Sequence, residues 1–320
     1  MKKTIKAVVA LMLVAVLAVS FAGCAKINYV TKGTIQAINE VKSGDWLNAG
    51  EDAGDTEAVE DKSVLETPFA AGTYGGVEFT SLDDVAAYYK EAYDYTKTLT
   101  ADLKNEDGST ETCYAFLGED DLTLDTILVD GKENATINNL VPGIMGGMFS
   151  KNVNALPPAK SRNPEYDKDD EGQDFRVCYL TGEDLLDANV VDNGDGTITI
   201  TMQPKLTEMS VPGKDAQGHM FSTLGDIGAT VASISVLSFS QGDANDNVKV
   251  TYKDGTAVVK IDTATKEIKE AEYTEIAYVA VTHANVTIIR DKSASLTIKY
   301  WEKFPCSDDY LMETKGITRL

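Results

Sequence analysis

The side chains best suited to acid–base or nucleophilic chemistry in this sequence are one histidine, one serine and many carboxylates. His219 follows a polar run, where it is placed to pair with an acid and a nucleophile. The run 238–242 ends like a G-x-S-x-G nucleophile elbow, but Ser238 stands where the first glycine is required. A glycosidase uses a pair of carboxylates, but with 51 acidic residues in the chain the sequence does not indicate which two would form such a pair. A single histidine in a polar loop is more often a surface or capping residue, so we predict no catalytic residue.

The cysteines and histidines give little support to a metal site. Cys113, Cys178 and Cys306 are too widely spaced for a zinc signature, and His219 and His283 are the only histidines in the chain. Three cysteines cannot all pair within one chain, so one disulfide with a free thiol and three reduced thiols both remain open. We predict no metal.

A glycine-rich acidic run, 192–196, has the composition of a calcium loop or of a hairpin turn. With Gly196 at the sixth position of an EF-hand loop, Val191 and Met202 occupy the two positions that need acidic ligands. We therefore predict a turn between two strands. The run also lacks the third glycine of a dinucleotide loop, and no Walker A motif is present elsewhere, so we predict no cofactor.

The N-terminus has the three parts of a secretory signal peptide: a basic start, an apolar run at 7–19, and small residues before Cys24. The apolar run has 13 residues, whereas a membrane-spanning helix needs about 20. The pair Ala22 and Gly23 before Cys24 resembles a bacterial lipobox, with Phe21 in place of the usual aliphatic residue. This resemblance implies that Cys24 receives a diacylglyceryl group and becomes the first residue after cleavage. An ordinary, unlipidated signal peptide is the alternative.

The net charge of −22 restricts the partners of the protein. The predicted signal peptide contains three lysines and no acid, so the chain that remains after cleavage is more acidic still. Such a surface repels nucleic acid and anionic headgroups. We expect the membrane to be contacted through the lipid anchor, at the outer, extracytoplasmic face of the cell membrane, where two acyl chains give stable attachment.

Three regions follow from composition. Residues 1–23 form the lipoprotein signal peptide, and residues 24–66 form a lipid-anchored N-terminus. That N-terminus has a short predicted helix at 34–42 and an acidic run at 51–61 that repels itself and reads as a flexible tether. Residues 67–320 form a single folded domain.

Within this domain, residues 113–131 and 178–194 share a pattern of Cys-Tyr, Gly-Glu-Asp and Val-Asp elements. An internal duplication and chance convergence both remain open.

The elements that must position any site begin with a helix at 81–99. Ser81 and Asp84 have the spacing of a capping box, and four tyrosines share one apolar stripe of this helix. We interpret the stripe as a buried face; a platform that stacks sugars is the alternative. A second helix is predicted at 219–233.

Strands dominate the second half of the domain. Residues 197–202 alternate between apolar and polar types. Further strands are predicted at 247–253, 256–262, 267–281, 284–290 and 293–301, with turns at 254–255 and 290–292. Because these strands follow one another without helices, the class is α+β, with a long, curved antiparallel meander and a few packed helices.

Runs at 26–30, 139–144, 192–197 and 315–319 resemble uncharacterised lipoproteins of Firmicutes-type gut anaerobes, a similarity that covers nearly the whole chain and implies no known activity. In architecture alone, a lipobox followed by helices and a long meander is similar to the LolA/LppX-type half-barrel lipoproteins. That similarity implies a curved sheet closed by helices around an acyl chain.

These features lead to one expected function and two alternatives. We expect a non-enzymatic lipoprotein that binds an apolar or amphipathic ligand between the sheet and the two predicted helices. The first alternative is a structural or protein-interaction lipoprotein of the envelope, with a core filled by its own side chains. The second is a surface hydrolase, which requires His219 to cluster with a serine or an aspartate in a cleft.

Overall fold

Three antiparallel sheets and three α-helices make up the part of the chain that the structure, a computed structural model, describes. The described residues are 61–135, 138, 151–159, 161–169, 171–225, 231, 237–286 and 289–320. The predicted signal peptide, Cys24, the helix predicted at 34–42 and most of the acidic run lie outside these residues.

The largest sheet has twelve strands, and it is open rather than closed into a barrel. Its main path runs β7-β6-β16-β15-β14-β10-β9, while β5 and β8 lie beyond β16, and β11, β12 and β13 attach alongside β15. The strands are β5 (Gly118–Leu124), β6 (Leu128–Val129), β7 (Lys132–Glu133), β8 (Val153–Asn154), β9 (Leu185–Asp192), β10 (Thr197–Pro204), β11 (Thr207–Glu208), β12 (Leu237–Phe239), β13 (Val248–Tyr252), β14 (Thr256–Asp262), β15 (Ile268–Val286) and β16 (Ile289–Phe304).

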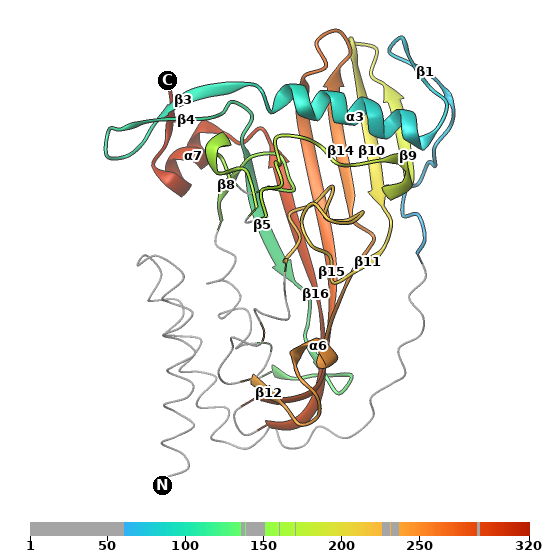
Figure 1. The fold of residues 1–320 in the computed structure, drawn as a ribbon, viewed down its shortest axis with the longest axis vertical. Helices are drawn as coiled ribbons and strands as arrows, with labels where there is room; N and C mark the ends of the chain where they lie inside the picture. Colours follow the sequence, from blue (N-terminus) through green and yellow to red (C-terminus); the bar gives the residue numbers. More distant parts are fainter. Residues whose placement is uncertain are drawn as a thin grey trace.

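The smaller elements surround this sheet. Figure 1 shows α3 crossing one end of the large sheet, and the β15–β16 hairpin extending far beyond it to the opposite end. The remaining elements are β1 (Gly72–Tyr74) with β2 (Val77–Phe79), the sheet of β3 (Thr100–Lys104), β4 (Thr110–Tyr114) and β17 (Thr318–Arg319), the helices α3 (Leu82–Thr96), α6 (Ala244–Asn247) and α7 (Asp308–Lys315), and the 3-10 turns η2 (Pro164–Tyr166) and η3 (Gly182–Asp184). The predicted α+β class and antiparallel sheet are confirmed.

The helix predicted from residue 81 forms as α3, and its capping box is present. The Ser81 hydroxyl accepts a hydrogen bond from the Asp84 amide at 3.3 Å, and the Asp84 carboxylate accepts one from the Ser81 amide at 3.1 Å. These bonds satisfy backbone donors that the first helical turn leaves without partners. Of the four tyrosines, Tyr88, Tyr89 and Tyr93 are buried, whereas Tyr95 is 41% exposed.

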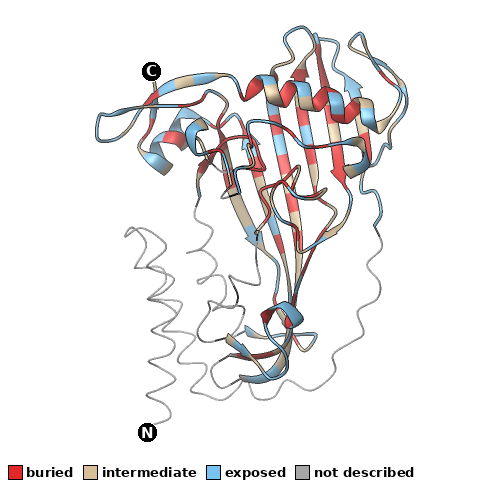
Figure 2. Ribbon diagram, viewed as in Figure 1, coloured by how far each residue is buried: buried red, intermediate tan, exposed pale blue. Residues whose placement is uncertain are grey.

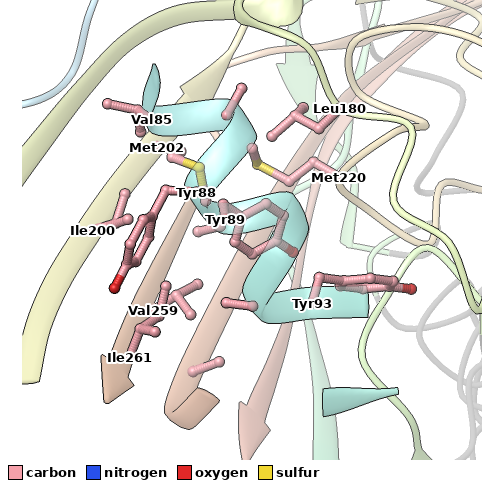
Figure 3. Packing of buried hydrophobic residues seen from close by; sticks show 14 of the residues in the cluster. Val85, Tyr88, Tyr89, Tyr93, Leu180, Ile200, Met202, Met220, Val259 and Ile261 are labelled. Atoms are coloured by element: carbon pink, nitrogen blue, oxygen red, sulfur yellow. The ribbon is translucent and has the colours of Figure 1, made fainter. Parts of the chain in front are cut away.

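The main hydrophobic core lies between α3 and the large sheet. Figure 2 shows buried residues concentrated on the strands beneath this helix. In Figure 3, Tyr88 of α3 lies close to Ile200 of β10 and to Val259 of β14. The predicted alternation in β10 is confirmed, because Ile198, Ile200 and Met202 are all fully buried while Thr199 and Thr201 are partly exposed.

Two predicted turns are confirmed and one is wrong. Residues 193–196 connect β9 to β10, and residues 254–255 lie between β13 and β14. The predicted turn at 290–292 is instead part of β16. The strand predicted at 267–281 and the first residues of the one predicted at 284–290 form a single 19-residue strand, β15. Register shifts between β15 and β16 explain the error, since His283 and Asp291 both have a φ of 51° at these irregularities. A bulge places polar residues inside a strand, where they look like a turn in the sequence.

The helix predicted at 219–233 is not observed over its first part. Residues 219–221 form turns and residues 222–225 have no regular structure, while 226–230 and 232–236 lie outside the described residues. The two segments of the suspected repeat also differ, because residues 118–120 start a strand and residues 182–184 form a 3-10 turn.

The folded region extends further toward the N-terminus than residue 67. The Val64 amide donates to Gln203 Oε1 at 2.8 Å, and Gln203 Nε2 donates to the Lys62 carbonyl at 3.0 Å. The amide of Phe69 and the hydroxyl of Ser63 both bind the Asp187 carboxylate. Residues 62–69 are therefore attached to β9 and β10, and they belong to the folded region rather than to the predicted tether.

Candidate functional site

The cysteines are structural residues of the interior. Cys113, Cys178 and Cys306 are all buried free thiols. Burial raises the pKa of Cys113 to about 11 and that of Cys178 to about 12. A thiol of this kind is a poor nucleophile and a poor metal ligand at neutral pH, because both roles require the thiolate. Of the two open alternatives, the structure has three reduced thiols. Cys24, the predicted lipidation residue, lies outside the described part of the chain.

His219 has an acidic partner. Its Nδ1 lies 3.0 Å from Asp184 Oδ2, and this oxygen also accepts hydrogen bonds from the amide and hydroxyl of Thr181. Within the described residues, no hydroxyl or thiol is hydrogen-bonded to the His219 ring. Two members of a catalytic triad are present here, but the nucleophile that the histidine would have to activate is missing from this contact set.

A second histidine brings a serine and an aspartate together at the bulge of the long hairpin. Ser240 Oγ donates to Asp291 Oδ1 at 2.5 Å, and His283 Nδ1 lies 2.8 Å from the same oxygen. In a catalytic relay the imidazole stands between the serine and the acid. Here the carboxylate stands between the serine and the imidazole, so the histidine cannot accept the Ser240 proton. These hydrogen bonds lower the pKa of Asp291, with the Ser240 bond as the largest cause. The cluster acts as a polar clamp across the bulge.

A band of buried carboxylates crosses the large sheet beside the main core. Asp120 on β5 stands opposite Glu302 on β16, and Glu275 on β15 stands opposite Tyr300 on β16. All three carboxylates are buried. Like charges directly opposite each other destabilise a sheet, so such a band requires polar partners.

Asn154 and Tyr300 are two of the polar partners of these carboxylates. Asn154 Nδ2 donates to Asp120 Oδ2 at 3.1 Å and to Glu302 Oε1 at 3.0 Å, which bridges the two opposed carboxylates. The Tyr300 hydroxyl donates to Asp120 Oδ2 at 2.9 Å. Burial is the largest cause of a raised Tyr300 pKa, and the charges of Glu302 and Asp120 act in the same direction. Tyr300 therefore remains a neutral hydrogen-bond donor.

A small hollow opens beside this carboxylate band. Its volume of about 10 Å³ is enough for roughly one water molecule. One part of its wall is polar and the other is apolar, with lining residues Leu122, Ser222, Leu224, Glu275, Ala277, Ile298 and Tyr300. The hollow thus joins hydrogen-bonding groups to a hydrocarbon surface.

The apolar side of the hollow continues along the sheet, away from α3. A second apolar region on the same face of the sheet, here called the lower apolar face, is centred on the buried residues Val248, Val250, Tyr252, Ala277 and Ile298. Partly buried apolar side chains pack around them: Leu122, Leu124, Met209, Leu224, Val231, Phe239, Val279, Val281 and Leu296. In contrast to the core beneath α3, this face keeps much of its apolar surface only partly covered.

Sequence reasoning missed the carboxylate band, although a signal for it exists. Glu302 shares the strand phase of Tyr300 and Ile298, and Glu275 shares that of Ala277. Side chains two residues apart on a strand point to the same face. The sequence therefore shows that these acids share a face with inward-facing apolar residues. It does not show that β5 pairs with β16, which brings Asp120 opposite Glu302.

The described residues contain neither a cluster of metal ligands nor a helix of membrane-spanning character. Their histidines, cysteines and carboxylates form no group of three or more that is able to hold a metal ion. Within the same residues, no helix has the length and apolar character needed to cross a membrane.

No protein-family model, curated protein or solved structure matches this chain.

Proposed function

We propose that this protein is a lipid-anchored lipoprotein of the outer face of the cell membrane that binds an apolar or amphipathic ligand without catalysis. One observation carries the binding proposal: the lower apolar face is only partly covered and adjoins a hollow with a polar wall. A hydrocarbon chain on the face and a polar group at the hollow would both be satisfied. The anchor at Cys24, and membership of the lipoprotein family that the sequence resembles, belong to the same proposal.

The space beneath α3 is a poor candidate for the ligand. Tyr89, Tyr93 and Tyr273 are fully buried there, and the hydroxyls of Tyr89 and Tyr273 are 2.8 Å apart. A ligand at this place would have to displace close-packed aromatic side chains, which costs several kcal/mol. We therefore locate the proposed site on the lower apolar face, away from the helix that the sequence suggested as its cover.

We propose a function without catalysis because of how the polar groups are arranged around the two histidines. His219 has a carboxylate partner without a bound nucleophile, and Ser240 and His283 share one carboxylate oxygen of Asp291. Among the described residues, neither cluster has a hydrogen bond from a serine hydroxyl to a histidine ring, which a hydrolase of this type requires; Ser240 Oγ reaches the backbone carbonyl of His283 instead.

Native mass spectrometry of the Cys24→Ser protein, mixed with phospholipid vesicles and repurified, tests ligand binding. We expect a species heavier than the polypeptide by one lipid. Val279→Asp, which places a carboxylate on the lower apolar face, should weaken lipid binding about tenfold or more, because this charge must be desolvated.

Val258→Asp is the matched control. Val258 is 39% exposed and lies on the opposite face of the sheet, in β14, so the same chemical change should leave lipid binding unaltered. Recovery of the bare polypeptide mass alone, or equal effects of the two variants, would refute the proposal.

The filled interior beneath α3 favours a second candidate, a structural or protein-interaction lipoprotein of the envelope. In that case the lower apolar face meets another protein, and Val279→Asp weakens capture of an envelope partner while no lipid is recovered. The same two variants therefore separate the candidates.

A further inference from the structure

A buried lysine and a buried aspartate meet where α3 ends. Lys97 follows the last residue of α3, and Asp167 follows the 3-10 turn η2. Lys97 Nζ lies 3.0 Å from Asp167 Oδ2, and the two side chains are 2% and 0% exposed. This contact is an ion pair that holds the lysine nitrogen beside the carboxyl group of Asp167.

Aromatic rings enclose this pair. Lys97 Nζ lies 4.3 Å from the ring centre of Tyr114 and 5.4 Å from that of Tyr93. The Tyr114 hydroxyl donates a hydrogen bond to Asp167 Oδ2 at 2.5 Å. The second carboxylate oxygen, Asp167 Oδ1, is buried and has no hydrogen-bond partner within the described structure. A buried carboxylate normally has both oxygens hydrogen-bonded, so this is an unusual setting for an ion pair.

We propose that Lys97 and Asp167 condense into an intramolecular amide, an isopeptide bond. In this step Lys97 Nζ, as the free amine, attacks Asp167 Cγ, and a Cγ–N bond forms. The Cγ–Oδ2 bond breaks, and Oδ2 takes up two protons and leaves as water. Both protons come from the original ammonium group of Lys97. An ammonium and a carboxylate thus become one amide and one water molecule, with no oxidant, reductant or other reactant involved.

Burial supplies the driving force. Two charges in an apolar enclosure carry a desolvation cost that a neutral amide avoids. Burial lowers the pKa of Lys97, which favours the free amine, although the nearby carboxylates of Asp167, Glu302 and Asp174 act in the opposite direction. The Tyr114 hydroxyl already points at Oδ2, the oxygen that must leave. It is therefore placed to deliver a proton to the leaving group.

The proposed bond would add a covalent link to the hydrogen bonds that already hold this part of the chain, such as those from the Tyr93 hydroxyl to the Phe175 carbonyl and from the Tyr114 amide to the Arg162 carbonyl. Within its described residues, the loop 161–175 has regular structure at η2 and at one isolated bridge alone, between Lys168 and Asp174. A covalent bond to the end of α3 would brace this loop. The three thiols of the described residues supply no such brace, because none forms a disulfide.

Peptide mapping of the complete protein tests the proposal directly. Trypsin does not cleave after a lysine whose amine is in an amide, so the digest should contain fragment 91–104 joined to fragment 163–168. The joined species should be lighter than the two fragments together by one water molecule, and tandem mass spectra should place the link at Lys97 and Asp167. Quantitative recovery of unmodified 91–97 and 163–168 would overturn the proposal.

Three variants sharpen this test. Lys97→Arg keeps a positive charge but should abolish the joined species. Tyr114→Phe keeps the ring and removes the proton donor, so we expect a lower fraction of joined peptide soon after synthesis; full linkage in this variant would overturn the role of Tyr114. Lys266→Arg is the control, because Lys266 also lies over a tyrosine ring, that of Tyr88, but has an exposed partner in Glu91. This variant should leave the joined peptide unchanged.

Discussion

At the scale of single residues, burial decides what a side chain of this protein can do. His283 and Asp291 meet at the surface, where they form a clamp, and Lys97 meets Asp167 in the interior, where we propose that they form an amide. Cys113, Cys178 and Cys306 also lie in the interior, and burial determines their reactivity.

We predict that the three thiols of the folded domain resist alkylation at pH 8. Cys113 and Cys178 have pKa values raised by burial to about 11 and about 12, so both remain protonated at this pH. Iodoacetamide should modify them only after unfolding in urea, as counted by mass spectrometry. Rapid labelling of the native protein would contradict this prediction.

The same shifts set the sign of the pH dependence. A thiol whose pKa is higher in the folded protein than its unfolded value of about 8.5 stabilises the fold fully below that value. This contribution is lost as pH rises toward 11 and 12. The urea midpoint should therefore fall between pH 8.5 and pH 11.

At the scale of elements, α3 is the part of the fold that joins local and distant interactions. Its start depends on a capping box four residues long, while its buried tyrosines depend on strands more than a hundred residues away. The β15–β16 hairpin is the opposite case, because its length and its bulges come from pairing between the two strands.

Removing the cap should destabilise α3 without altering the fold. Ser81→Ala deletes the hydroxyl that accepts from the Asp84 amide, and loss of such a cap costs about 1 kcal/mol. Urea unfolding monitored by circular dichroism should show this decrease. Ser295→Ala, the same change at an exposed strand position, should have an effect close to zero. Equal stabilities of the two variants would count against the role of the capping box.

At the scale of the whole molecule, the sequence predicts a folded body displayed outside a membrane. Residues 62–69 are hydrogen-bonded to β9 and β10, so the predicted lipid-anchored N-terminus runs from Cys24 to about that point. Its acidity keeps it away from anionic headgroups, which leaves the proposed lipid anchor as the route of attachment.

Cys24→Ser should abolish incorporation of radioactive palmitate and release the protein from the membrane fraction. The variant should keep the ligand binding proposed above, because the lower apolar face is far from the anchor in the chain. Cys306→Ser serves as the control and should retain the label. Persistent labelling of Cys24→Ser would disprove the lipobox interpretation.

The sequence by itself determined the features that depend on neighbouring residues. The capping box of Ser81 and Asp84, the turns at 193–196 and 254–255, and the alternation in β10 follow from backbone preferences within a few residues. Only the tertiary structure decided which distant side chains meet. The carboxylate band, the order of Ser240, Asp291 and His283, and the contact of Lys97 with Asp167 depend on strand register and on loop placement. The residues in these contacts are 8 to 180 positions apart in the chain. Strand register and loop placement bring them together, and no local sequence pattern specifies either.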